Sequence, residues 1–227
     1  MNRMMHRIKE LKNYAFGKEY IVERTIRFAT LSAILNAFLA LFRIGMGFYT
    51  RSPLYCVYGI YHAGIGIAKY TTANKPTQGE ERKNYKTVGL IVFITCMVYV
   101  LYCSKMVICG EGNIYRNAAT AIMLSKLALL EVGKSIFCVF NTWSLKNLTV
   151  LAAKRINLVT ALVSLVLTLS TFLEMNGFPI VARYNGWVGL FVGFVSALIG
   201  LQMMFQKTES DRATSNPVSI NNSLTEP

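Results

Sequence analysis

The chain has 227 residues, of which 53% are hydrophobic and only 15% are charged. This composition, with a mean hydropathy of +0.40, excludes an ordinary soluble domain, because the apolar residues come in long blocks rather than in amphipathic stripes. The formal net charge of +13 requires no nucleic-acid partner, since membrane topology and attraction to anionic lipid account for it.

Six apolar stretches are long enough, or nearly so, to cross a bilayer, whose hydrocarbon core requires about 20 apolar residues in a helix. They cover residues 26–49, 53–70, 87–109, 118–140, 156–175 and 185–206. We expect helices because a spanning segment must satisfy its backbone hydrogen bonds internally. The sequence therefore predicts an all-α, polytopic membrane protein with a six-transmembrane-helix bundle at residues 26–206.

The two ends of the chain differ from this bundle. Residues 1–25 mix basic and apolar side chains at roughly helical spacing, which predicts a cytoplasmic segment with an interfacial helix. Residues 207–227 are polar and low in aromatic side chains, so we expect a disordered cytoplasmic tail. This tail is too short to form a soluble C-terminal domain.

Lysine and arginine are distributed unevenly around the predicted spans. Seventeen of them flank the spans on the side that carries both termini, whereas the opposite side has only Arg51, Arg116 and Arg183. The positive-inside rule therefore predicts a multi-pass protein of the cell membrane whose N- and C-termini are cytoplasmic.

Few ionisable side chains lie inside the spans, where such groups are costly and mark a bundle interior. His62 lies near the middle of the second span, and Glu131 and Lys134 lie three residues apart in the fourth. Two interpretations are open. Glu131 is a proton or cation carrier with His62 as its partner, or Glu131 pairs with Lys134 to set helix register and His62 is a satisfied interior histidine.

Arginine and lysine near span ends have a simpler expected role. Arg43 and Lys105 each lie within about two helical turns of a span end, from which a long side chain reaches the interface. We therefore expect both side chains to extend toward the headgroups rather than into the bundle.

Small residues recur at three- or four-residue spacing in the second and sixth spans, which allows helices to approach closely. They are Gly59, Ala63 and Gly66 in the second span and Gly189, Gly193 and Ala197 in the sixth. Close packing within the chain is one interpretation, and a homodimer interface is the other.

The run "NAFLALFRIGMGFYTRSPL" at 36–54 and the run "NLTVLAAKRINLVTALVS" at 147–164 resemble segments of the cation diffusion facilitator (cation efflux) family. There, a small-residue run closes the first span and a Gly-Ser turn opens the second. This resemblance implies a six-helix fold with both termini inside, a cation as the transported substrate, exchange against protons, and a dimeric assembly.

The resemblance also implies a metal site of Asp or His ligands, two on the second span and two on the fifth, each pair four residues apart. The matching positions of this chain hold Tyr61, Ile65, Ile156 and Thr160. None is a carboxylate or an imidazole, the ligands that zinc-like ions prefer, while His62 and Asn157 each lie one residue beyond a matching position. We therefore expect a divergent relative with no standard metal site, no cofactor and no cytoplasmic metal-binding domain.

The sequence contains no G-x-S-x-G elbow, H-E-x-x-H pair or aspartate dyad, so we do not expect an enzyme. The candidate cation or proton pathway consists of His62, Glu131, Lys134, Tyr61, Asn157 and Thr160. The sequence favours a membrane protein that moves a cation. The alternative is a non-transporting scaffold or partner-binding subunit with a degenerate metal site.

Overall fold

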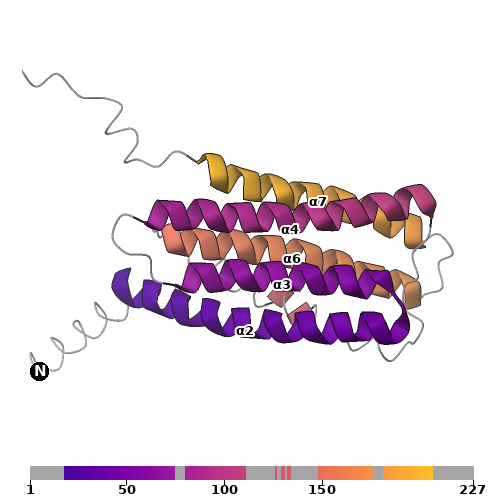
Figure 1. Cartoon of the computed structure of the whole chain (residues 1–227), viewed down its shortest axis with the longest axis horizontal. Helices are drawn as coiled ribbons and strands as arrows, with labels where there is room; N and C mark the ends of the chain where they lie inside the picture. Colours follow the sequence, from indigo (N-terminus) through magenta and orange to yellow (C-terminus); the bar gives the residue numbers. More distant parts are fainter. Residues whose placement is uncertain are drawn as a thin grey trace, which may run out of the picture.

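The computed structural model describes residues 18–74, 80–110, 126, 129–130, 132–133, 148–175 and 181–206. Its helices are α2 (Lys18–Thr50), α3 (Pro53–Ala73), α4 (Glu81–Cys109), α6 (Leu148–Met175) and α7 (Val181–Phe205). They lie side by side along one axis as a bundle (Figure 1). No strand occurs in this part of the chain, and the predicted all-α class is confirmed.

Four of these helices contain a segment long and apolar enough to cross a membrane. The segments are Val22–Tyr49, Glu81–Cys109, Leu148–Leu169 and Arg183–Phe205. The prediction of six spans is therefore not supported by the described helices. Helix α3 does not qualify because its 21 residues include a histidine, a lysine and four tyrosines, which lower its hydropathy.

Several predicted segments lie outside the described residues. Of the expected span at 118–140, only residues 126, 129–130 and 132–133 are described, and these are helical. The predicted tail at 207–227 and residues 1–17 of the predicted N-terminal segment also lie outside. Residues 18–25 form the first turns of α2.

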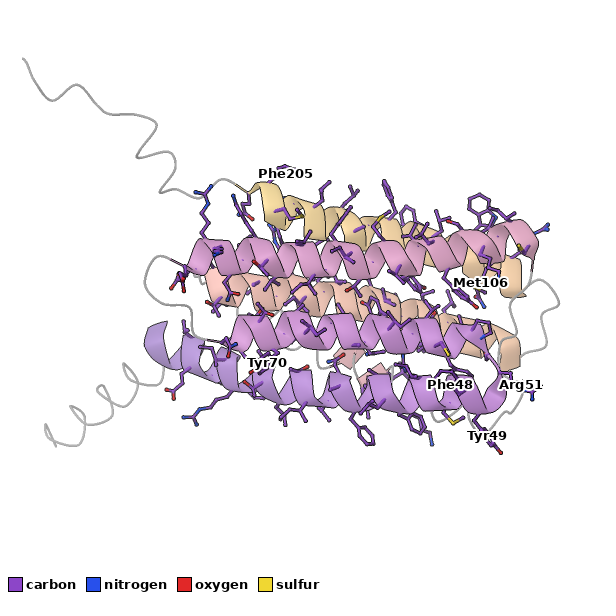
Figure 2. The ribbon with its side chains drawn as sticks, in the orientation of Figure 1. Phe48, Tyr49, Arg51, Tyr70, Met106 and Phe205 are labelled. Carbon is purple, nitrogen blue, oxygen red and sulfur yellow. The ribbon has the colours of Figure 1, made fainter. Side chains whose placement is uncertain are left out.

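The outward faces of the bundle carry large apolar side chains. Phe38, Leu41 and Phe191 are 66%, 73% and 68% exposed, and soluble monomers rarely present so many large apolar side chains to water. At the helix ends, Tyr49 and Phe205 also point away from the bundle (Figure 2). This surface and the four apolar segments indicate a membrane-embedded protein.

A tight turn joins α2 to α3. Arg51 adopts the left-handed conformation with φ 53°. The backbone N–H of Ser52 donates to the carbonyl of Gly47 at 3.0 Å, and that of Arg51 donates to Phe48 at 3.4 Å. This Schellman pattern ends α2, and Pro53 then begins α3 without losing a helical hydrogen bond. The short connection makes α2 and α3 antiparallel neighbours.

Helices α4 and α7 pack with their backbones close together. A Cβ atom added at Gly200 of α7 would lie 2.8 Å from the backbone nitrogen of Phe93 and 3.0 Å from the carbonyl oxygen of Gly89, both on α4. Gly189 and Gly193 face α4 in the same way. This contact depends on the absence of side chains on one face of α7.

The small-residue face of α3 also packs within the chain. Gly59 lies against Ala40 and Ile44 of α2, and Gly66 lies against Ala33 and Asn36 of the same helix. Together with the α4–α7 contact, this arrangement agrees with close packing inside one chain. A homodimer would have to form through a different face.

Candidate functional site

A buried polar cluster surrounds His62 between α2 and α3. The side chains of His62 and Asn36 are each 1% exposed, and the Nδ1 atom of His62 lies 3.0 Å from the Oδ1 atom of Asn36. The Nδ2 atom of Asn36 donates to the carbonyl of Ser32 at 2.7 Å. Because the amide nitrogen is the donor, Oδ1 must accept, and His62 therefore carries a proton on Nδ1.

Tyr61 links the same region of α3 to α6. Its side chain is 1% exposed, and its hydroxyl donates to the carbonyl of Val159 at 3.2 Å. The rings of Tyr61 and His62 lie edge to face with centroids 5.7 Å apart. Thr160 follows Val159 and is equally buried, but its hydroxyl donates to Ile156 of its own helix at 2.8 Å.

Tyrosines extend the cluster to α4. The hydroxyl oxygens of Tyr58 and Tyr99 lie 3.5 Å apart, and the ring centroid of Tyr99 lies 6.0 Å from that of Tyr61. Tyr58 is 4% exposed and Tyr99 is 1% exposed. The three tyrosine rings therefore pack together between α3 and α4 inside the bundle.

Arg43 lies in the interior, which contradicts the prediction that it extends to the interface. Its side chain is 1% exposed, and its guanidinium carbon lies 5.7 Å from the ring centroid of Tyr58. Residue 43 is on the face of α2 that meets α3, where the ring of Tyr58 attracts the cation through its π electrons. Lys105, for which the same role was expected, is exposed.

Lys69 is a second interior cation that the sequence interpretation missed. Its side chain is 4% exposed, and its Nζ atom donates to the hydroxyl of Ser32 at 2.9 Å. The spacing of polar residues on α2 could have revealed the polar face that Lys69 contacts. Ser32, Asn36 and Arg43 follow one another by four and seven residues, a spacing that puts them on one face of a helix.

The structure brings together only some of the predicted pathway residues. Tyr61, His62 and Thr160 lie in the interior, whereas Asn157 is half-buried. Glu131 and Lys134 lie outside the described residues, so a contact between Glu131 and His62 stays a prediction.

The described residues contain no group of three or more His, Cys, Asp or Glu side chains that could hold a metal ion. The four positions that match the cation efflux ligands are nevertheless all buried, with exposures of at most 1%. They are Tyr61 and Ile65 on α3 and Ile156 and Thr160 on α6. These positions can pack helices and donate hydroxyl hydrogen bonds, but they offer no zinc-type ligand.

Comparison of the chain with protein-family models, with curated proteins and with solved structures found no match. The geometry of the chain itself is therefore the basis for a functional proposal. Its main features are an apolar outer surface and a buried polar cluster around His62.

Proposed function

We propose that the chain is a multi-pass membrane protein with transporter-like architecture, which moves a cation across the cell membrane in exchange for protons. The observation that carries this proposal is the buried cluster of His62, Asn36 and Tyr61 in a bundle with an apolar outer surface. Ionisable and polar groups inside a membrane domain are expensive, and they commonly mark ion pathways.

The hydrogen bond to Asn36 defines what His62 can do chemically. It holds the Nδ1 proton of the ring, so Nε2 is the nitrogen that can gain and lose a proton. In the proposed function His62 transfers protons at Nε2, and Glu131 is its expected acidic partner.

The positions of α3 and α6 support a resemblance to the cation efflux architecture. The four positions that match the family's ligands are buried on α3 and α6, the helices from which that family supplies its ligands. The proposed bundle has six spans. Four of them contain the clear apolar segments, and the other two are α3 and residues 118–140. Both termini of the proposed protein are cytoplasmic. Because these four residues are not Asp or His, we propose a divergent relative.

Flux measurements on the purified full chain in proteoliposomes test this function. A pH-sensitive dye inside the vesicles would report proton movement when zinc, manganese or cadmium is added outside. We expect flux from the native chain and a loss of about tenfold or more in His62→Gln and Glu131→Gln, equivalent to about 1.4 kcal/mol in the barrier.

Tyr70→Phe is the matched control on α3, because Tyr70 is 58% exposed and lies outside the cluster. It should transport at the native rate. No flux for any of these ions, or flux that His62→Gln and Glu131→Gln leave unchanged in a folded protein, would contradict the proposal.

A non-transporting scaffold is the second candidate, and the packing around His62 favours it. Gly64, two residues along α3, has no room for a Cβ beside the side chain of Thr95 on α4, so the helices are tightly joined at this level. In a scaffold, the bond between His62 and Asn36 would only set the register of α2 and α3. His62→Gln would then change thermal stability while every flux stayed at the level of protein-free vesicles.

A further inference from the structure

A second polar site lies at the end of the bundle where α4 and α6 begin and α7 ends (Figure 1). The guanidinium carbon of Arg155 on α6 lies 5.9 Å from the ring centroid of Tyr85 on α4. The hydroxyl of Tyr85 in turn donates to the Oε1 atom of Gln206, directly after α7, at 2.9 Å. Three helices therefore meet around this guanidinium group.

The Nη1 atom of Arg155 is buried and makes no hydrogen bond. Among the described side chains no carboxylate forms an ion pair with Arg155. A buried, charged N–H group without an acceptor is costly. A group of this kind indicates an acceptor that the described side chains do not supply, such as an ion or a water molecule.

Three more basic residues lie near Tyr85 and Arg155 in the sequence of α4 and α6, and the acidic Glu80 and Glu81 stand at the same end of α4. Arg82 precedes Tyr85 by three residues, which puts it on the same face of α4, and Lys86 and Lys154 lie next to Tyr85 and Arg155 in the sequence. We call Arg82, Lys86, Lys154 and Arg155 the basic corner. Their combined positive charge favours an anion at this end of the bundle.

An apolar stripe on α4 leads away from the basic corner. Leu90, Ile94, Val98 and Leu101 follow Lys86 at intervals of three or four residues, and they are 41%, 54%, 36% and 66% exposed. Such spacing forms one continuous face of a helix. A lipid whose acyl chain lies on this stripe would have its headgroup beside Lys86, whereas Tyr85 and Arg155 meet toward the interior side of α4.

We propose that the basic corner binds the phosphate of an anionic phospholipid headgroup, with Arg155 as the main donor. The planar guanidinium group matches phosphate oxygens with two parallel hydrogen bonds. Basic residues at the end of a membrane domain lie where anionic headgroups are concentrated. This proposal does not depend on whether the chain transports an ion.

Binding of added lipid to the full chain in detergent micelles tests this site. Native mass spectrometry and thermal unfolding would be measured with phosphatidylglycerol, with phosphatidylcholine and with inorganic phosphate at the same phosphate concentration. We expect phosphatidylglycerol to be retained and to raise the Tm, whereas phosphatidylcholine and inorganic phosphate do neither.

Arg155→Gln should weaken phosphatidylglycerol binding about tenfold or more, because a charge-assisted hydrogen bond is lost. Lys83→Gln is the control, since it removes one exposed positive charge at the same end of α4 and should have less than about a twofold effect. If Arg155→Gln fails to fold, Arg155→Lys replaces it, and the loss of the planar fork should still weaken binding.

Three outcomes would overturn the proposal. Equal weakening by Arg155→Gln and Lys83→Gln would show a diffuse electrostatic attraction. Equal binding of phosphatidylcholine, whose choline cation balances its phosphate, would show that the basic corner does not recognise the net negative charge of the headgroup. A rise in Tm with inorganic phosphate alone that depends on Arg155 would assign the site to free phosphate rather than to lipid.

Discussion

Two helix pairs of this bundle are held together in different ways. Between α2 and α3, polar side chains meet: His62 contacts Asn36, Lys69 contacts Ser32, and Arg43 lies over a tyrosine ring. Between α4 and α7, glycines bring the backbones together, as at Gly200. The α2–α3 interface combines these polar contacts with close glycine packing at Gly59, whereas the α4–α7 interface consists mainly of small residues and apolar side chains.

This difference matters in a membrane, because lipid tails are as apolar as the side chains of the helices, and no hydrophobic effect drives one helix against another. Helices there associate through close van der Waals packing or through interhelical hydrogen bonds. The α4–α7 pair relies mainly on packing, and the α2–α3 pair adds buried hydrogen bonds to its packing. The α2–α3 interface contains a histidine, which can exchange a proton, so this interface is the better place for chemistry. The α4–α7 contact is the better anchor.

The largest expected effect is at the α4–α7 contact. Gly200→Ala should lower the free energy of unfolding by about 3 kcal/mol, because the new methyl group would meet backbone atoms of Phe93 and Gly89 that cannot move away cheaply. Thermal unfolding in detergent micelles would measure this change.

Gly45→Ala is the matched control for that substitution, because a Cβ there meets nothing within 4 Å. It should stabilise α2 by about 0.5–1 kcal/mol, the difference in helix propensity between the two residues. Equal effects of the two substitutions would show that α4 and α7 do not pack through Gly200.

At the α2–α3 interface, Asn36→Leu should cost about 1–2 kcal/mol, since it removes the acceptor of the His62 Nδ1–H group in the interior. His62→Leu should have a similar effect. The double variant should lose less than the two single variants together, because neither partner is then left unsatisfied. Chemical unfolding of all four proteins measures the coupling, and strict additivity would refute the bond.

A substitution in the turn between α2 and α3 should raise the stability of the protein rather than lower it. Arg51→Gly should stabilise the chain by about 1 kcal/mol, because Arg51 has φ 53° and only glycine adopts this conformation without steric cost. The Tm would report the gain. A lower Tm would mean that the Arg51 side chain makes a contact worth more than this strain.

The smallest expected effect concerns the link between α3 and α6. Tyr61→Phe removes only the hydroxyl that donates to Val159 and should cost about 0.6 kcal/mol, the average for such bonds in a membrane protein. Tyr70→Phe should leave the Tm unchanged, since Tyr70 is 58% exposed. If both variants unfold at the native temperature, the Tyr61 bond adds nothing to stability.

The predicted spans match the helices well at one end and less well at the other. The third span was expected at 87–109 and the fifth at 156–175, whereas α4 is Glu81–Cys109 and α6 is Leu148–Met175. Both helices begin earlier, at the end rich in lysine and arginine. Apolar length measures the membrane-crossing part of a helix, but charged residues continue the same helix beyond it.

The site was only partly predictable. The burial of His62 was expected because an ionisable group inside a span faces the bundle interior, and the structure agrees. Tyr61 was named only through the resemblance to the cation efflux family, and it is buried as well. Asn36 and Lys69 were missed because their importance depends on the partner across the interface. The contribution of Glu131, which lies outside the described residues, stays a prediction.

The sequence by itself determined the helical class and the membrane-embedded character of this protein, because the length and apolar content of a segment are local properties. Only the tertiary structure decided that Arg43 lies over Tyr58 in the interior and that Asn36 holds the ring of His62. Helical periodicity shows which residues share a face, but it does not show which helix that face meets. That choice depends on contacts between residues far apart in the chain.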